Sequence, residues 1–198
     1  MSGYGTNALQ FLIEAVFDLY AMIIVLRFLM QSVRADYYNP VSQFVVKVTN
    51  PVLVPLRRLV PSVAGHDTAS LVFAIAVLFV KLAILYAAGA RGVGIAGSVV
   101  FLQNAGIMTL LALAGIELVA LIINIFFFAI IVHVVLSWIS QGGHNPIASL
   151  LFSLTQPILK PVQRFVPPIG GLDLSPVVAI IGLQLLKLLI LPPLLALL

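Results

Sequence analysis

The chain contains no cysteine, which excludes disulfide bonds, thiolate metal ligands, catalytic thiols and covalently attached c-type haem. Charge is almost as scarce, because 8% of the 198 residues are charged. A soluble domain needs about 25% charged residues to cover its surface. With 62% hydrophobic residues, this chain cannot supply that polar shell. The composition therefore indicates an integral membrane protein.

Four apolar runs are long enough to cross a bilayer as helices, for which about 20 residues suffice. They cover 9–31, 68–88, 115–138 and 174–195. The segment before the first run lacks basic residues and the run contains Glu14 and Asp18, so we expect it to be retained and not cleaved as a signal peptide. The formal net charge of +4 points to anionic lipid head groups and not to nucleic acid.

The chain repeats itself without a gap at a shift of 106 residues, which aligns 39–85 with 145–191. Beside many interchangeable apolar pairs, the copies share less common identities, among them four prolines in one register. Such a match indicates a duplicated structural unit. The repeat-motif residues are Asn39, Pro40, Thr49, Pro51, Pro55, Arg58, Pro61, Gly65 and Asp67 in the first copy, and Asn145, Pro146, Thr155, Pro157, Pro161, Arg164, Pro167, Gly171 and Asp173 in the second.

Each unit is predicted to contain a helix, a proline-rich connector and a second helix. The first repeat covers 1–88, the second covers 115–198, and a glycine-rich join over 89–114 separates them. The apolar stretch 98–113 is short for a span, so we expect a re-entrant or interfacial helix there. The predicted fold class is an all-α integral membrane protein with four transmembrane helices in two parallel tandem repeats.

Lysine and arginine are concentrated in the two connectors, about 32–67 and 138–173. The positive-inside rule then places both connectors in the cytoplasm and both termini outside. A fifth span through 98–113 would invert the second repeat and export its basic connector. The charge distribution argues against that topology.

Each connector begins with Asn-Pro, which has the chemistry of a helix start, because Asn caps free N–H groups and Pro lacks one. The apolar spacing that follows predicts an amphipathic helix of about ten residues, lying on the membrane surface. The pattern T-x-P-x-L-x-P-x-x-R-x-x-P comes next, at 49–61 and 155–167. Prolines at this density predict an extended, kinked elbow and not a regular helix.

Two functional interpretations attach to the connectors. In the first, the elbow is a rigid turn that returns the chain into the membrane. In the second, its basic residues contact anionic lipid or a partner protein. The two interpretations are compatible. Asp67 and Asp173, just before the second helix of each repeat, are interpreted as N-caps in preference to catalytic or ion-binding groups. The basic residues assigned to lipid or partner contact are Arg57, Arg58, Lys160 and Arg164.

Polar residues within an apolar span are costly and mark function by default. Helix depths bring Lys81 level with Glu14 or Asp18. The second copy offers Lys187 a partner in Glu117, and Asn124 replaces Asp18 there. These pairs are predicted to lock each helical hairpin or to line a polar pocket, with snorkelling and a transport path as alternatives. The full intramembrane polar set is Glu14, Asp18, Lys81, Glu117, Asn124 and Lys187.

Catalytic and metal-binding motifs are missing from the sequence. It has no Walker loop, GxGxxG, HExxH or nucleophile elbow, so we expect neither enzymatic activity nor a cofactor. His66 and His144 lie in connectors without a second ligand at metal spacing, and His133 stands where the first copy has Arg27. We therefore expect no metal site.

The connector sequences NPVSQFVVKVTNPVLVPLRRLVPSVAGHDTASLV and NPIASLLFSLTQPILKPVQRFVPPIGGLDLSPVV resemble the repeat of the YggT family, which is related to YlmG of Gram-positive bacteria and plastids. The resemblance covers nearly the whole chain. It implies a small, multi-pass protein of the bacterial inner membrane without established enzymatic activity, associated with cell division, envelope organisation and tolerance of osmotic or ionic stress. Gln163 stands where the first copy has Arg57, so the first connector is expected to be the stronger binding site.

Three functions remain open from the sequence. The first is a non-enzymatic adaptor of the envelope or division machinery that binds anionic lipid and a membrane protein partner through its elbows. The second is a small homo-oligomeric ion or solute transporter or channel subunit, favoured by the intramembrane charges. The third, by analogy with the plastid relatives, is an assembly factor for a membrane complex.

Overall fold

The computed structural model describes residues 2–62, 67–90, 92–103, 105–139, 145–166 and 173–198. The motif residues Gly65, Pro167 and Gly171 lie outside the described residues. The described chain forms six α-helices and one antiparallel hairpin. These are α1 (Ser2–Ser32), α2 (Pro40–Leu59), α3 (Thr68–Ala87), β1 (Gly92–Ile95), β2 (Ser98–Phe101), α4 (Ile107–Ile139), α5 (Pro146–Phe165) and α6 (Ser175–Ala196).

Four of these helices are long and apolar enough to cross a membrane, over Asn7–Ser32, Thr68–Ala87, Ile107–Ile139 and Ser175–Ala196. They correspond to the four apolar runs, so the predicted membrane-helical class is confirmed. The third span begins earlier than expected, because nothing after Gly106 interrupts the helix. The residues 107–114 therefore belong to α4 and not to the join.

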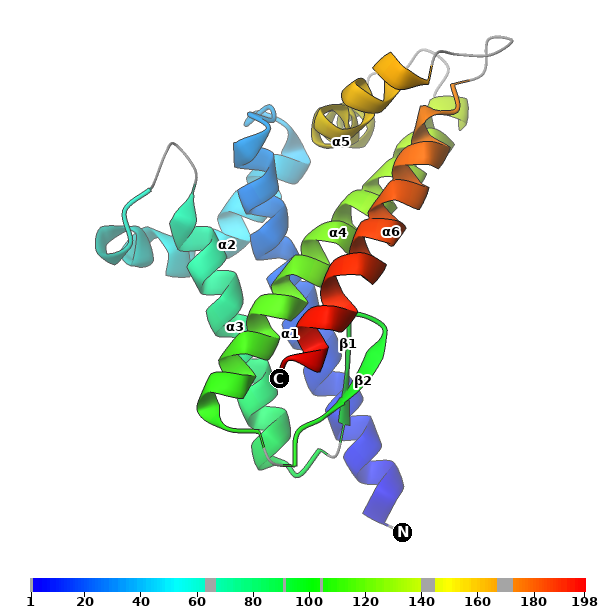
Figure 1. Ribbon diagram of the computed structural model, residues 1–198. Helices are drawn as coiled ribbons and strands as arrows, with labels where there is room; N and C mark the ends of the chain where they lie inside the picture. Colours follow the sequence, from blue (N-terminus) through cyan, green and yellow to red (C-terminus); the bar gives the residue numbers. More distant parts are fainter. Residues whose placement is uncertain (1, 63–66, 91, 104, 140–144, 167–172) are drawn as a thin grey trace.

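The two repeats run parallel to each other. In Figure 1, α2 and α5 both lie toward the upper end of the bundle, whereas the β-hairpin lies toward the lower end. The chain thus leaves α1 and α4 at the same end and returns through α3 and α6. We call the end that carries α2 and α5 the connector end, and the opposite one the hairpin end.

The spans pack in a row and not in a closed ring. Within the repeats, α1 packs on α3 and α4 packs on α6, while α3 and α4 join the two repeats. Alanines allow close approach, since Ala21, Ala74 and Ala114 are completely buried. In α3, 44% of the most apolar 18-residue stretch is buried inside the protein, whereas in α6 the share is 11%. The span α6 therefore has the lowest buried share of the four and the largest surface for lipid.

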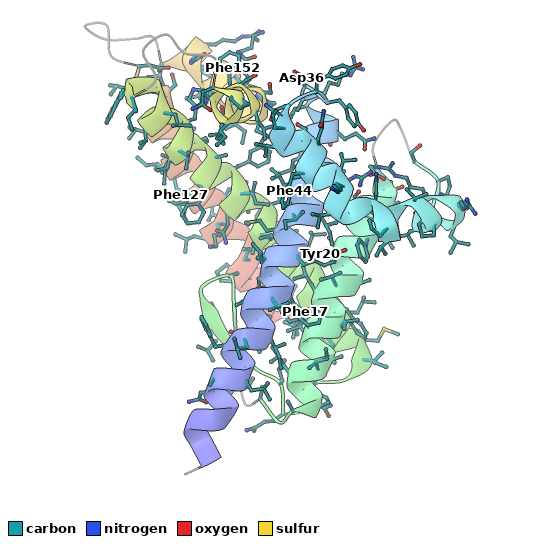
Figure 2. The ribbon with its side chains drawn as sticks, turned by 180° about the vertical axis from the view of Figure 1, so that it is seen from behind. Phe17, Tyr20, Asp36, Phe44, Phe127 and Phe152 are labelled. Carbon is teal, nitrogen blue, oxygen red and sulfur yellow. The ribbon has the colours of Figure 1, made fainter. Side chains whose placement is uncertain are left out.

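Aromatic contacts support the pairing of α1 with α3. The rings of Tyr20 and Phe73 meet edge to face with their centroids 5.8 Å apart. Figure 2 shows Tyr20 beside α3 from the reverse side of the molecule. Such a pair adds about 0.5–1.5 kcal/mol beyond area burial.

The helices α2 and α5 begin as the sequence predicts. Asn39 accepts a hydrogen bond from the Val41 N–H (2.9 Å), and Asn145 accepts one from the Ile147 N–H (3.0 Å). Proline occupies the first turn of each helix. Asn39 also donates its amide to the Pro146 carbonyl (2.6 Å), which ties the two helix starts together.

The prediction of an extended elbow after a short helix is wrong. Both helices have 20 residues and continue through their internal prolines, Pro51 and Pro55 in α2 and Pro157 and Pro161 in α5. A spacing of four residues puts both prolines of each helix on one face. That face is exposed, so the carbonyls that lose a donor can be hydrated instead of being buried unsatisfied.

The prediction of a re-entrant or interfacial helix over 98–113 is also wrong. Residues 92–95 and 98–101 form an antiparallel hairpin in which Ile95 pairs with Ser98. The two turn residues, Ala96 (φ +58°) and Gly97 (φ +93°), are both left-handed, as a type I′ turn requires. The apolar side chains of Val93 and Ile95 are buried against the bundle. The apolar stretch 98–113 is divided between strand β2, the buried Leu102 and the start of α4.

Candidate functional site

An ionic cluster with two buried members and one half-exposed member joins three of the four spans. Lys81 on α3 forms ion pairs with Asp18 on α1 (2.5 Å) and with Glu117 on α4. The Lys81 residue is 3% exposed and Glu117 is 9% exposed. A charge buried at this depth requires such partners, because water is unavailable to solvate it. We call Asp18, Lys81 and Glu117 the triad.

The structure selects between the sequence-predicted partners of Lys81. It places Asp18, and not Glu14, against the amine. Glu14 instead accepts a hydrogen bond from Gln10 (2.9 Å), whose amide also reaches the Gly92 carbonyl (2.9 Å). The N-terminal half of α1 is thereby fastened to the β-hairpin.

The predicted pairing of Lys187 with Glu117 is wrong. Lys187 donates to the side-chain oxygen of Asn124 (3.0 Å), the residue that corresponds to Asp18. The equivalent contacts Lys81–Asp18 and Lys187–Asn124 tether the two spans of each repeat to each other. Glu117 crosses to the first repeat because α4 packs directly against α3. Sequence reasoning missed this contact, since the repeat pattern relates residues within a unit but carries no information about how two units meet.

A second tether in each repeat holds the connector helix to the preceding span. Arg27 is 6% exposed and donates to the hydroxyl of Thr49 (2.5 Å) and to the Val46 carbonyl (3.3 Å). At the corresponding positions, His133 Nδ1 lies 3.2 Å from the hydroxyl of Thr155. The sequence contained one indication of this tether. Thr49 and Thr155 are identical repeat-motif residues, and each copy has a basic residue, Arg27 or His133, at the same position of the preceding helix.

The third tether links the end of each connector helix to the start of the next span. Arg57 forms an ion pair with Asp67, which stands at the N-cap position of α3 and also accepts a hydrogen bond from Ser70 (2.6 Å). Burial opposes the charge of Asp67, but hydrogen bonds from Arg57 and Ser70 outweigh burial and hold its pKa below the ordinary value. Asp67 therefore anchors Arg57 besides marking the helix start.

The second repeat keeps the geometry of this tether but not its charge. Gln163 donates to Asp173 (2.9 Å) where the first repeat has the ion pair. Asp173 accepts a hydrogen bond from the backbone N–H of Ser175 (2.8 Å). Hydrogen bonding from the side chain and the backbone of Ser175 lowers the pKa of Asp173. Among the described residues, Asp67 thus stands at the predicted N-cap position but makes no side-chain capping bond to a helix N–H, whereas Asp173 precedes the N-cap residue of α6, Leu174, and bonds the first helical N–H.

Comparison of the repeats shows one consistent trend. All three tethers occupy equivalent positions, but a charged residue in the first repeat is replaced by a neutral or weakly basic one in the second. The replacements are Asp18 by Asn124, Arg27 by His133 and Arg57 by Gln163. The second copy adopts the same repeat fold with neutral or weakly basic hydrogen-bonding residues at these positions. The additional charges of the first copy are therefore not required by the fold.

The remaining basic residues assigned to lipid or partner contact lie on the surface. Arg58, Lys160 and Arg164 are all exposed, whereas Arg57 is committed to Asp67 and to Gln31 (3.4 Å). Large apolar side chains accompany them at the ends of the helices, where Leu59 is 80% and Phe165 is 86% exposed. Figure 2 shows Phe44 and Phe152 on the same pair of helices.

Metal binding finds no support in the part of the chain that the structure describes. Those residues contain no group of three or more His, Asp or Glu side chains placed to hold a metal ion.

Four spans, two parallel repeats and a tethered connector helix in each define a multi-pass membrane protein built by duplication of a helix–connector–helix unit. The chain belongs to the CCB3/YggT family, whose model matches residues 6–88 and 112–194. The resemblance drawn from the connector motifs is thereby confirmed.

Relatives cover nearly the full chain. A protein of Vibrio alginolyticus, described as uncharacterized and encoded in the proC 3′ region, is 41% identical over 90% of both chains. An uncharacterized protein of Pseudomonas aeruginosa is 40% identical over 96% of this chain and 91% of its own. The uncharacterized YggT protein of Escherichia coli K12 is 37% identical over 91% of this chain and 88% of its own. No solved structure matches the chain.

Proposed function

We propose that this protein is a non-enzymatic adaptor of the bacterial inner membrane, with α2 and α5 on the cytoplasmic surface. The single observation that carries the proposal is the exposure of both cationic and large apolar side chains along this pair of helices. An amphipathic surface of this kind binds the boundary of a bilayer that contains anionic lipid. It also offers exposed apolar anchors to a protein partner.

The distribution of charge supports the cytoplasmic assignment. The connector end carries exposed Arg34, Lys47, Arg58, Lys160 and Arg164. Basic residues near the ends of spans favour retention on the cytoplasmic side. On this assignment both termini lie outside.

The partner is proposed to belong to the envelope or division machinery, with a consequence for tolerance of osmotic or ionic stress. This part of the proposal draws on the family resemblance. A standing partner, and not a transient client, distinguishes the adaptor from an assembly factor.

Photo-cross-linking in living cells tests the adaptor proposal. Probes at Leu59 and Phe165 occupy matched positions in the two repeats, and both are highly exposed. Leu53 and Leu159 are the matched controls, since they are 0% and 5% exposed on the same helices. We expect a stoichiometric foreign membrane protein at the exposed pair and none at the buried pair. Capture of nothing but lipid and further copies of this chain would contradict the adaptor.

A transporter or channel subunit is the second candidate, because of one feature of the triad. Glu117 Oε2 is buried and has no hydrogen-bond partner among the described residues. An unpaired carboxylate oxygen inside a membrane is typical of sites that exchange protons or cations. Salt-dependent flux in proteoliposomes, abolished by Lys81→Met but not by Lys187→Met, would favour this candidate over the adaptor.

A further inference from the structure

The first repeat contains a cavity at the connector end. Several residues that line it are replaced by different residues at the equivalent positions of the second repeat. The cavity has a volume of about 450 Å³ and lies between the end of α1, the turn after it and α2. Arg27, Arg34 and Arg57 line it together with Gln31, Ser42 and Asn50. We call it the arginine pocket. Its volume falls in the range of roughly 300–1,000 Å³ typical of small-molecule sites.

We propose that the arginine pocket binds a phosphate group. Three guanidinium groups converge on one cavity, and the carboxylate of Asp67, bound to Arg57, neutralises one of them. The pocket therefore keeps an excess of positive charge. Guanidinium groups present planar pairs of N–H donors that match the oxygens of a phosphate.

The arginines retain donors for a ligand. Within the described part of the chain, Arg27 engages its Nη1 atom and Arg34 makes no side-chain hydrogen bond or ion pair. Arg57 directs Nε and Nη2 at Asp67 and Nη2 at Gln31. Each guanidinium has five N–H donors, so a ligand can be bound without breaking the tethers.

Ser42 supplies an independent observation. It lines the pocket, is 1% exposed, and its hydroxyl has no hydrogen-bond partner among the described residues. A buried hydroxyl without a partner destabilises the fold, because it has lost its bonds to water. A phosphate oxygen in the pocket would accept a hydrogen bond from this hydroxyl and remove that penalty.

The backbone at Arg34 adds to the argument. Arg34 adopts a left-handed conformation (φ +53°), with its N–H bonded to the Gln31 carbonyl and the Ala35 N–H bonded to the Met30 carbonyl. This is the helix ending at which glycine is usual, because the Cβ of any other residue is strained in the left-handed conformation. An arginine held in that position at the mouth of a cationic pocket is consistent with a binding role for its side chain.

The second repeat serves as an internal comparison. His133, Ala148 and Gln163 stand at the positions of Arg27, Ser42 and Arg57. The connector is nevertheless tethered in the same way, through His133 and Gln163. The repeat fold therefore forms without the positive charges of Arg27 and Arg57 and without the hydroxyl of Ser42.

Two sources of the phosphate group fit the position of the pocket. One is the head group of an anionic phospholipid, since the pocket lies at the end of a membrane span. The other is a free phosphorylated molecule that enters from the aqueous side. The inference deepens the proposed function, because it names a class of ligand for the first connector. It rests on that proposal for the placement of the pocket on the cytoplasmic side.

The test uses the full-length protein in a non-ionic sugar detergent that contains no phosphate. One arm adds phosphatidylglycerol and counts retained lipid by native mass spectrometry. The other arm adds sodium phosphate, with sodium chloride at equal ionic strength as the control, and follows the thermal midpoint. A ligand that binds the folded state raises this midpoint as its concentration rises.

Three variants define the outcome. Arg34→Gly removes one guanidinium and the backbone strain together, and Ser42→Ala removes the unpaired hydroxyl, so neither should destabilise the unliganded protein. Arg58→Gln removes the same charge from the same connector, but Arg58 does not line the pocket. We expect Arg34→Gly to weaken binding roughly tenfold or more, Ser42→Ala less, and Arg58→Gln hardly at all.

Retention of one phosphatidylglycerol that Arg34→Gly abolishes would identify a lipid head group. A midpoint raised by phosphate in the wild type but not in Arg34→Gly would identify a free phosphate. Equal behaviour of wild type and Arg34→Gly in both arms would overturn the inference, as would an equal loss in Arg58→Gln. The adaptor proposal is tested separately, because cross-linking at Leu59 and Phe165 does not depend on the pocket.

Discussion

Replacement of Lys81 by methionine tests whether the triad holds the spans together. The variant keeps most of the length of the side chain but removes the cation that is paired with Asp18 and Glu117. Two carboxylates are then left close together, one of them deeply buried, within the membrane. The matched control is Lys187→Met, which removes the equivalent lysine but breaks a bond to a neutral amide, the 3.0 Å contact with Asn124.

The expected magnitudes differ between the two variants. Removing one partner of a buried ion pair costs about 3–5 kcal/mol, because an uncompensated charge remains. A single polar contact between membrane helices contributes about 0.6 kcal/mol on average. Since 1 kcal/mol shifts the thermal midpoint of a chain of this size by about 2–4 °C, Lys81→Met should lower it by roughly 6–20 °C and Lys187→Met by about 1–3 °C.

Thermal unfolding of the purified protein in detergent, followed by loss of the monodisperse peak, measures both shifts. A third variant, Lys81→Met with Asp18→Asn and Glu117→Gln, removes all three charges. It should recover most of the lost stability, because no buried charge is left unpaired. The reasoning fails if Lys81→Met is no worse than Lys187→Met, or if the triple variant is as unstable as Lys81→Met.

Three further predictions follow from the connector and hairpin geometry. Because the pKa of Asp67 lies below its ordinary value of 3.8, its ion pair stabilises the fold fully above that value and is lost as pH falls through the lower, folded-state pKa. Asp67→Asn should therefore lower the thermal midpoint at neutral pH and flatten its acid dependence in a pH series of melts. Replacing the left-handed Ala96 by asparagine should stabilise the hairpin by roughly 1 kcal/mol, whereas Gly97→Ala should destabilise it, both measured as midpoint shifts. Changing Pro51 and Pro55 together to alanine should raise the thermal midpoint with little change in helicity by circular dichroism, since α2 is already helical through both prolines and an interior proline costs up to about 3 kcal/mol in a helix; a large gain in helicity would show that the wild-type segment is not helical.

The connector illustrates how sequence reasoning succeeded and failed within one segment. Its start is a local matter, because an Asn cap and a proline in the first turn act on neighbouring N–H groups, and Asn39 and Asn145 behave accordingly. Its continuation past Pro51 and Pro55 depends on surroundings. Arg27, from another helix, holds α2 in place by donating to Thr49 and to the Val46 carbonyl. The carbonyls that lose their donors to Pro51 and Pro55 belong to Lys47 and Pro51, which lie on the exposed face.

The candidate sites divide in the same way. Lys81 and its acidic neighbours stood out in the sequence because charge within an apolar span is costly wherever it occurs. Which acid reaches the amine is set by helix packing. The arginine pocket gave no sequence signal beyond its scattered arginines, since Arg27, Arg34, Ser42 and Arg57 come together only when α2 folds back against α1.

The sequence by itself determined the membrane class, the four spans, the internal duplication and the places where the connector helices begin. These properties depend on composition, on segment length against bilayer thickness, and on interactions between residues a few positions apart. Only the tertiary structure decided that Glu117 serves the first repeat, that the join is a hairpin, and that the charges of the first connector surround a cavity. Those outcomes depend on which faces of distant helices meet, and that information lies in the packing of the whole chain.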